Sequence, residues 1–151
     1  MCIRDRFCEN LGIKHEFSAP KTPQQNGVAE RKNRVLLDMA TVMMNSRNIA
    51  KNLWAEAVNT ACHIIHRVYL RAGLDKTPYE LWNGKVPNIK YFRVFGSKCH
   101  ILRDRENLGK FDSKSDEGIF LGYASDSRAY RVYNTRTKTT QESINVIIDD
   151  C

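Results

Sequence analysis

The sequence has no long apolar run, which excludes a typical membrane-spanning segment. No stretch of the 151 residues approaches the roughly 18 consecutive apolar residues that a transmembrane helix requires. The N-terminus, MCIRDRFCEN, also lacks the apolar core of a secretory signal peptide. We therefore expect an intracellular protein with no membrane partner.

The cysteines form no CxxC pair, so the sequence does not indicate a closed zinc site. They are odd in number and widely spaced: Cys2, Cys8, Cys62, Cys99 and Cys151. Without an export signal we expect them to be reduced thiols. Cys62 falls in an apolar helical stretch, which predicts a small core residue.

The sequence also lacks the composition of a disordered chain. Hydrophobic residues make up 42% and charged residues 27%, as in ordinary globular proteins. The 24 Lys and Arg residues exceed the 17 Asp and Glu residues, so the formal net charge is +7. This moderate excess favours a polyanionic partner but does not identify one.

The N-terminal half has the apolar spacing of helices. A long amphipathic helix is predicted from Gly27 to about Asn48, with Val35, Met39 and Met43 on its apolar stripe. A second is predicted from about Lys51 to Ala72, stopped by Gly73. A short third helix should begin at Thr77-Pro78-Tyr79-Glu80, where Thr77 and Glu80 fit a capping box, and end at Asn83-Gly84.

Beyond Tyr91 the pattern changes to short β-branched and aromatic segments. These are FRVFGSKCHILR, EGIFLGYAS, AYRVYNT and TTQESINVIID, and Asn134 to Lys138 is typical of a hairpin turn. Four or five short strands suggest a small barrel. The predicted fold class is therefore α+β, with a helical half followed by a β half and a joint near residues 73–92.

The stretch SAPKTPQQNGVAERKNR is the most informative for chemistry. It is a polar loop that enters a helix whose first turn carries Glu30, surrounded by Arg31, Lys32 and Arg34. A carboxylate can bind a divalent cation, and the neighbouring cations can hold phosphates, so the set suits metal-assisted phosphoryl transfer. The alternative is a Glu30 placed by the helix dipole and paired with Arg34, four residues later on the same face.

Several segments resemble, in order, the integrase region of copia-type LTR retrotransposon Pol polyproteins. They are GIKHEFSAPKTPQQNGVAERKNR, LWAEAVNTACHIIHRV, KTPYELWNGKVPNIKYFRVFGSKCHI and GKFDSKSDEGIFLGYASDSRAYRVYNTRTKTTQESINVIIDD. The resemblance runs from about Phe7 to Asp150. It implies C-terminal helices of an RNase H-like catalytic core over residues 7–73, a linker with a short helix over 74–92, and an SH3-like β-barrel over 93–150. Residues 1–6 fit poorly and suggest a foreign leader.

The resemblance assigns Glu30 to the third carboxylate of an Asp-Asp-Glu triad that holds two Mg²⁺ or Mn²⁺ ions. It implies DNA integration in the complete protein and DNA, both element ends and target, as the partner. Other integrase protomers are a further implied partner, and the nucleus is the expected location of the complete integrase. The implied DNA-binding residues surround Glu30: Arg34, Arg31, Lys32, Gln25 and Asn26.

The sequence departs from this family at the other two ligands. Both aspartates of the triad lie further upstream than the chain reaches, and Asp5 is too close to Glu30 to replace either. The zinc-binding His/Cys module of the integrase N-terminus is missing too. We therefore expect a truncated integrase that binds DNA without catalysing strand transfer. The alternatives are a non-catalytic protein-interaction and assembly module, or a decayed element.

Other candidate residues have a structural and a functional interpretation. His63 and His66 have no third ligand, so a metal site is disfavoured. Trp54 and Trp82 are predicted to be core residues or interdomain anchors. Packing is favoured over base stacking for Tyr123, Tyr130 and Tyr133. A basic barrel face is suggested by Lys98, Arg103, Arg105, Arg128 and Arg131, against a solvated surface interrupted by Asp104, Glu106 and Asp126.

Overall fold

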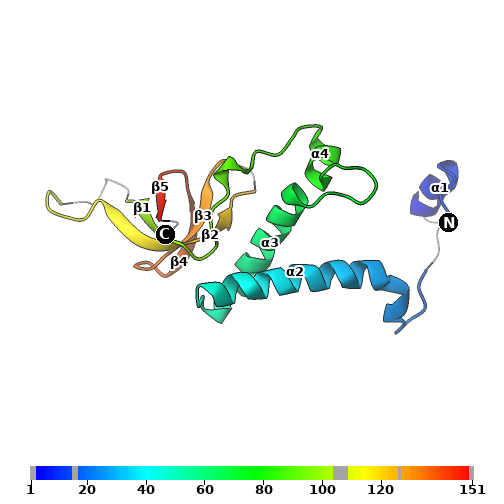
Figure 1. The fold of residues 1–151 in the computed structure, drawn as a ribbon, viewed down its shortest axis with the longest axis horizontal. Coiled ribbons are helices and arrows are strands. Elements are labelled where there is room, and N and C mark those ends of the chain that lie inside the picture. The colour runs from blue at the N-terminus through cyan, green and yellow to red at the C-terminus, as the bar shows by residue number, and fades with distance from the viewer. Residues whose placement is uncertain (1–2, 15–16, 104–108, 126, 150–151) are drawn as a thin grey trace. The chain divides into compact units, whose positions relative to one another are not determined.

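The computed structural model describes residues 3–14, 17–103, 109–125 and 127–149, with side chains from residue 6 onward (Figure 1). The chain divides into two compact units, residues 1–35 and 36–151. This division reflects compactness and does not test the domain boundaries implied by the family resemblance. Those boundaries, at residues 7–73, 74–92 and 93–150, stay a prediction. Asp104, Arg105, Glu106, Asp126 and the side chain of Asp5 lie outside the described part.

The first unit contains two helical elements and the first turns of a third. Helix α1 spans Ile3–Asn10 and the 3₁₀ turn η1 spans Pro23–Asn26. Helix α2 follows directly at Gly27 and runs to Ser46, and the division between the units falls within it. The sequence pattern predicted α2 correctly, whereas α1 was not predicted. Its apolar Phe7 is 62% exposed, so burial of that side chain contributes little to the helix.

The helices of the second unit confirm most of the local signals. After α2 come η2 (Lys51–Leu53), α3 (Trp54–Val68), α4 (Pro78–Asn83) and η3 (Ile89–Tyr91). The capping box of α4 is present: Glu80 N donates to Thr77 Oγ1 at 3.2 Å, and Thr77 N donates to Glu80 Oε2 at 2.8 Å. Gly84 ends α4 in the left-handed conformation, at φ +66°. Helix α3 ends four residues earlier than predicted, because Tyr69 is already extended.

The β half forms one antiparallel sheet of five strands in the order β4-β3-β2-β1-β5. The strands are β1 (Lys98–Leu102), β2 (Ser115–Tyr123), β3 (Tyr130–Asn134), β4 (Thr139–Ser143) and β5 (Val146–Asp149). The predicted hairpin turn is confirmed, because Asn134 pairs with Thr139 and Asn134 Oδ1 accepts from Arg136 N at 2.9 Å.

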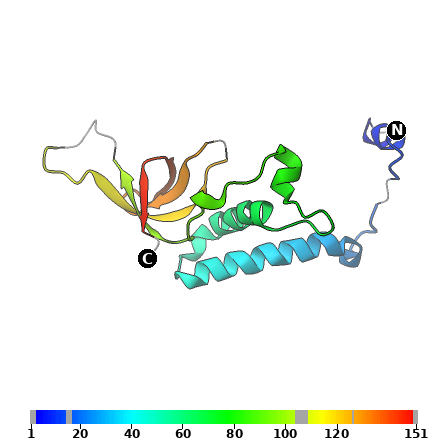
Figure 2. The ribbon, with the colours of Figure 1, turned by 45° about the horizontal axis from the view of Figure 1, so that its top comes forward.

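The sheet must curl, because its two edge strands are neighbours in sequence. Only two residues separate Ser143 on β4 from Val146 on β5. Three Cα steps span at most about 11 Å, whereas the edges of a flat five-stranded sheet would lie about 19 Å apart. The strands follow this curl in Figure 2. The result is the barrel-like arrangement expected of a small closed sheet.

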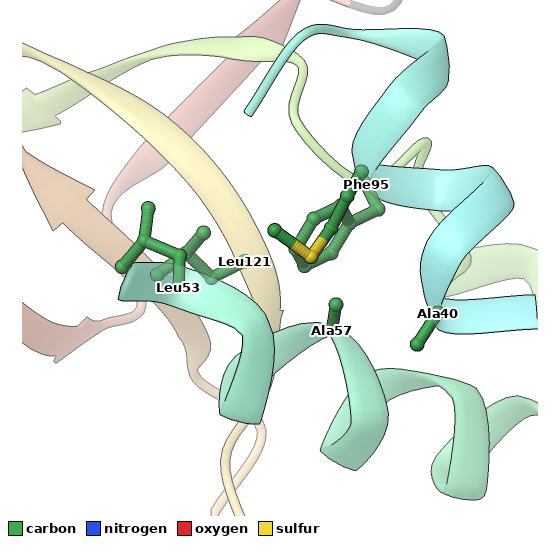
Figure 3. Packing of buried hydrophobic residues seen from close by; sticks show 6 residues of the cluster. Ala40, Leu53, Ala57, Phe95 and Leu121 are labelled. Carbon is green, nitrogen blue, oxygen red and sulfur yellow. The ribbon is translucent and has the colours of Figure 1, made fainter. Parts of the chain in front are cut away.

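Two buried clusters lie on opposite sides of the sheet. On one side Leu121 joins Phe95 and the helical residues Ala40, Met44, Leu53 and Ala57 (Figure 3). On the other side Phe120 packs with Cys99, Ile101 and Val132. Successive residues on β2 point to opposite faces, so Phe120 and Leu121 each serve one cluster. The apolar stripe of α2 and α3 is therefore covered by the sheet as well as by helix packing.

Helix α3 is fastened to β2 and β3 by polar contacts. Thr60 Oγ1 donates to the carbonyl of Leu121 at 2.6 Å, and a Cβ on Gly122 would overlap that hydroxyl. Arg131 on β3 donates to both carboxylate oxygens of Glu56, at 2.7 and 2.9 Å. These contacts fix α3 against β2 and β3, although the contacting residues are more than sixty positions apart in the sequence.

The core interpretation is wrong at three positions. Trp82 is 89% exposed and Trp54 is 48% exposed, so neither is a core residue, and their alternative role as interdomain anchors stays a prediction. Cys62 is exposed because the buried face of α3 is formed by its neighbours Thr60 and Ala61. The assignment of α2 and α3 to an RNase H-like core stays a prediction. Across the described ranges, no helix has the length and apolar character needed to span a membrane.

Candidate nucleic-acid interface

Glu30 lies in the first turn of α2, and its side chain is exposed. The loop before it is ordered by its own polar groups: Thr22 Oγ1 donates to Ala19 O at 2.5 Å, and Ala19 N donates to Gln25 Oε1 at 2.9 Å. Gln25 therefore acts on the loop backbone in this structure. Asn26 ends η1 with an exposed side chain.

Three exposed cations follow Glu30 on α2: Arg31, Lys32 and Arg34, which we call the α2 basic cluster. At about 100° per residue, Arg34 shares the face of Glu30, Arg31 lies beside Arg34, and Lys32 points to the other side. Within the described part of the chain, none of these cations is within ion-pair distance of a carboxylate. The alternative Glu30–Arg34 ion pair is not formed, so the exposed guanidinium of Arg34 is accessible to an external anion.

The described side chains do not assemble a metal site. Among them, no group of three or more His, Cys, Asp and Glu residues is arranged to hold an ion. Glu30 thus supplies a single carboxylate, whereas two clustered ions need several shared oxygen ligands. His63 and His66 belong to no such group among the described residues either.

Acidic side chains pair with two of the arginines suggested for a basic barrel face, Arg103 and Arg131. Arg131 is held by Glu56 and, at 3.3 Å, by Glu142. Arg103 approaches Asp116 at 3.3 Å, and Arg136 donates to both oxygens of the same carboxylate at 2.8 Å. The hydrogen bonds from Arg136 lower the pKa of Asp116 to about 2. Of the five suggested cations, Lys98 and Arg128 remain as exposed candidates, and Arg105 is outside the described residues.

Tyr123 and Tyr130 pack, as predicted, in an aromatic cluster that also includes His63, Phe92 and Phe120. The His63 ring stacks on Tyr123 with centroids 4.2 Å apart and planes at 16°. Phe92 tilts against both rings, at 5.9 Å from His63 and 5.6 Å from Tyr123. Tyr130 meets Phe120 edge to face. Tyr133 packs separately, against the helical cluster.

His63 is a neutral member of this cluster. Burial, reinforced by the charges of Arg67 and His66, lowers the pKa of His63 to about 4. Its Nδ1 is buried and has no hydrogen-bond partner among the described residues. The imidazole therefore behaves as an aromatic surface at neutral pH rather than as a cation.

Two adjoining hollows open beside these rings, between α3 and the turn that joins β2 to β3. The larger hollow has a volume of about 420 Å³ and the smaller about 310 Å³. They share His63, Arg67, Tyr123, Ala124 and Ser125. Sequence reasoning missed them, because their walls come from segments that are far apart in the chain.

Comparison with known proteins places the β half in a family. Residues 97–151 match the family model for the retroviral polymerase SH3-like domain. The chain is 34% identical over 143 residues to the retrovirus-related Pol polyprotein from transposon TNT 1-94 of Nicotiana tabacum, a match that covers 95% of the chain and 11% of that protein. For the Pol polyprotein from transposon RE1 of Arabidopsis thaliana the identity is 32%, covering 92% and 10%.

Two further comparisons concern a shorter protein and a solved structure. An uncharacterized mitochondrial protein of Arabidopsis thaliana is 32% identical over 90 residues, which covers 59% of this chain and 75% of that protein. A chain of the simian T-cell lymphotropic virus intasome, solved with the PP2A regulatory subunit B56 gamma, superimposes with a TM-score of 0.38 and 15% identity, covering 97% of this chain and 52% of that one. That structural likeness is too low to support any conclusion.

The chain spans about a tenth of the length of the Pol polyproteins it matches. Those matches nevertheless extend over most of its own residues, across both the helices and the sheet. The SH3-like match coincides with the five-stranded sheet described above. The chain therefore belongs to the copia-type retrotransposon Pol polyproteins and carries their SH3-like domain.

Proposed function

We propose that this chain is a DNA-binding segment of a retrotransposon integrase. The observation that carries the proposal is the α2 basic cluster, whose three cations are exposed and without ion pairs in the described structure. Exposed Arg and Lys side chains bind phosphates and release the counterions that surround DNA. In the complete integrase this segment would serve DNA integration at element ends and target DNA, in the nucleus.

The geometry of α2 ranks the contacts. Arg34 lies on the face of Glu30 and Arg31 lies beside Arg34, and their planar guanidinium groups suit bidentate phosphate binding. Lys32 points away from this face and would reach a different phosphate or only solvent. Gln25 orders the preceding loop, and the exposed Asn26 offers an amide beside the cations. Since phosphates carry no sequence information, the binding should be non-specific.

Catalysis by this chain alone is not part of the proposal. In the complete enzyme Mg²⁺ or Mn²⁺ would supply two-metal phosphoryl transfer, with Glu30 as one ligand. The described donor set does not fit such a pair of ions, because Glu30 is in no group of three or more described His, Cys, Asp and Glu residues that could hold an ion. We expect no metal-dependent strand transfer by the isolated chain.

A salt titration of duplex-DNA binding tests the proposal. Fluorescence anisotropy would give Kd for the wild type, Arg34→Ala and Lys32→Ala across a range of salt concentrations. Each lost phosphate contact should flatten the logarithmic salt dependence by about one unit. We expect that change in Arg34→Ala and a smaller one in Lys32→Ala, its matched control on the same helix. An unchanged slope in a folded Arg34→Ala protein would remove the residue from the interface.

Exposed apolar side chains near α4 favour a second candidate function, assembly with other integrase protomers. Trp82 is 89% exposed, Val86 80% and Ile89 58%. Large exposed apolar groups of this kind mark protein interfaces when they adjoin one another. An assembly module would self-associate with little response to salt, and Trp82→Ala would reduce that association without altering DNA binding. Sedimentation at high and low salt distinguishes this function from DNA binding.

A further inference from the structure

The larger hollow combines aromatic walls with cationic groups. Its described lining includes the rings of Tyr91, Phe92 and Tyr130 and two arginines, Arg67 and Arg128. None of its described lining residues is acidic, although Asp126 in the same turn lies outside them. Its volume of about 420 Å³ falls within the range of ligand pockets, about 300–1,000 Å³.

The two arginines differ in how they are held. The Arg67 guanidinium lies over the Tyr79 ring, 4.6 Å from its centroid, and Nη1 donates to the carbonyl of His63 at 3.3 Å. Arg128 is exposed in the β2–β3 turn. Arg67 therefore provides a fixed positive charge at the wall, and Arg128 provides an adaptable one at the rim.

The aromatic groups are similarly divided between fixed and accessible ones. His63 and Tyr123 are stacked on each other and form the floor shared with the smaller hollow. Tyr130 is fixed by a hydrogen bond from its hydroxyl to the carbonyl of Tyr91 at 3.4 Å. Tyr91 itself is 56% exposed at the opening, so its ring is accessible to a flat ligand.

We propose that the larger hollow binds an unpaired nucleotide of single-stranded nucleic acid, with the base against Tyr91 and its neighbours and the phosphates at Arg128 and Arg67. Single strands expose bases that stack on aromatic side chains, while a positive rim follows their backbone. A duplex keeps its bases stacked inside. A concave hollow can therefore contact only the phosphates and the groove edges of a duplex. The proposal uses none of the α2 basic cluster and does not depend on the function proposed above.

The adjoining smaller hollow supports this assignment. Its described lining includes Asn59, His66 and Ser125, which carry hydrogen-bonding groups. The described lining also holds the carboxylate of Glu142, which lies 3.3 Å from Arg131 and shares that cation with Glu56. The continuous surface through His63 and Tyr123 therefore leaves room for a neighbouring nucleotide.

Binding of a labelled oligothymidylate, measured by anisotropy, tests the proposal. Loss of one stacking contact or of one charged phosphate contact should weaken binding about tenfold. We expect this in Tyr91→Ala and Arg128→Ala, whereas Tyr91→Phe should bind like the wild type because it keeps the ring. Lys98→Ala is the matched charge control, an exposed cation on β1 that does not line the hollows. NMR should show the His63 and Tyr123 ring signals shifting with the oligonucleotide.

Three results would overturn the proposal. The first is unchanged oligothymidylate binding in both Tyr91→Ala and Arg128→Ala while circular dichroism shows them folded. The second is equal weakening in Lys98→Ala, which would indicate a general charge effect. The third is competition by polyglutamate as effective as that by the oligonucleotide, which would indicate an acidic peptide site. Tyr91→Ala should leave duplex binding unchanged, and the salt slope of Arg34→Ala tests the α2 basic cluster, so a failure of either proposal is distinguishable from a failure of the other.

Discussion

Thr60 offers the sharpest test of how α3 is held against the sheet. Its side chain is 2% exposed, and its hydroxyl donates to Leu121 O at 2.6 Å. The register between β2 and β3 is irregular here: Phe120 pairs with Val132 and Gly122 with Arg131, so Leu121 is left without a partner on β3. A bulge of this kind interrupts the ladder, and the helix supplies the donor for the extra carbonyl.

Thr60→Val keeps the shape of the side chain and removes the donor. The Leu121 carbonyl then stays buried without its side-chain partner, which costs about 1–3 kcal/mol of unfolding free energy. For a unit of this size the Tm should fall by about 3–4 °C per kcal/mol. Thr41→Val is the matched control, because Thr41 Oγ1 also donates to a backbone carbonyl, that of Leu37 at 2.8 Å, but at an exposed helix position. We expect the control to change stability by less than about 0.5 kcal/mol.

A double-mutant cycle of Thr60 and Gly122 tests whether these two residues are in direct contact. A Cβ at position 122 would overlap Thr60 Oγ1, and the φ of +152° is also unfavourable for a side chain. Gly122→Ala should therefore destabilise strongly, and Thr60→Ala should relieve part of that cost in the double variant. Urea denaturation of the four proteins measures the coupling. Costs that simply add would refute the close packing of α3 on β2.

Two further predictions concern pH. The pKa of His63 is about 4 in the folded chain against 6.5 for an ordinary histidine, so the unfolded state binds the proton first. Stability should therefore fall as the pH drops from about 6.5 to 4, by on the order of 3 kcal/mol, and urea midpoints of His63→Asn should lack this slope. The pKa of Asp116 is lowered to about 2, so its contribution is present above about pH 4 and lost as the pH falls toward 2. Asp116→Asn should lower the free energy of unfolding by about 1–2 kcal/mol at pH 7. The cost is small for such a pair because Arg136 is partly exposed to water. Stability curves of the variant and the wild type that converge near pH 2 would support this.

The elements with local signals were predictable. The capping box at Thr77, the left-handed Gly84 and the turn after Asn134 each act within five residues, so their sequence pattern is sufficient. Helix α2 has an uninterrupted apolar spacing and begins at the predicted Gly27. The position of Glu30 in its first turn followed from the same reasoning, as did the neighbouring cations.

The long-range features were not predictable from one sequence. Thr60 and Leu121 are 61 residues apart, and no local pattern signals that a helix completes a bulge. The same holds for the hollows, whose walls join α3 to a distant turn. Trp82 was predicted to be a core residue or an interdomain anchor, but on the short helix α4 it is 89% exposed. Hydrophobicity predicts burial only where a covering element exists.

The SH3-like domain of this chain does not hold its whole core within the matched residues 97–151. Leu121 on β2 is buried against Phe95, Leu53 and Ala57, all of which precede the match. Ile119 and Tyr133 are partly buried by the same helical cluster, so that face of the sheet is covered. A nucleic acid cannot lie flat across covered strands. The nucleotide contacts proposed above avoid these covered positions, because the larger hollow and Arg128 lie at the β2–β3 turn.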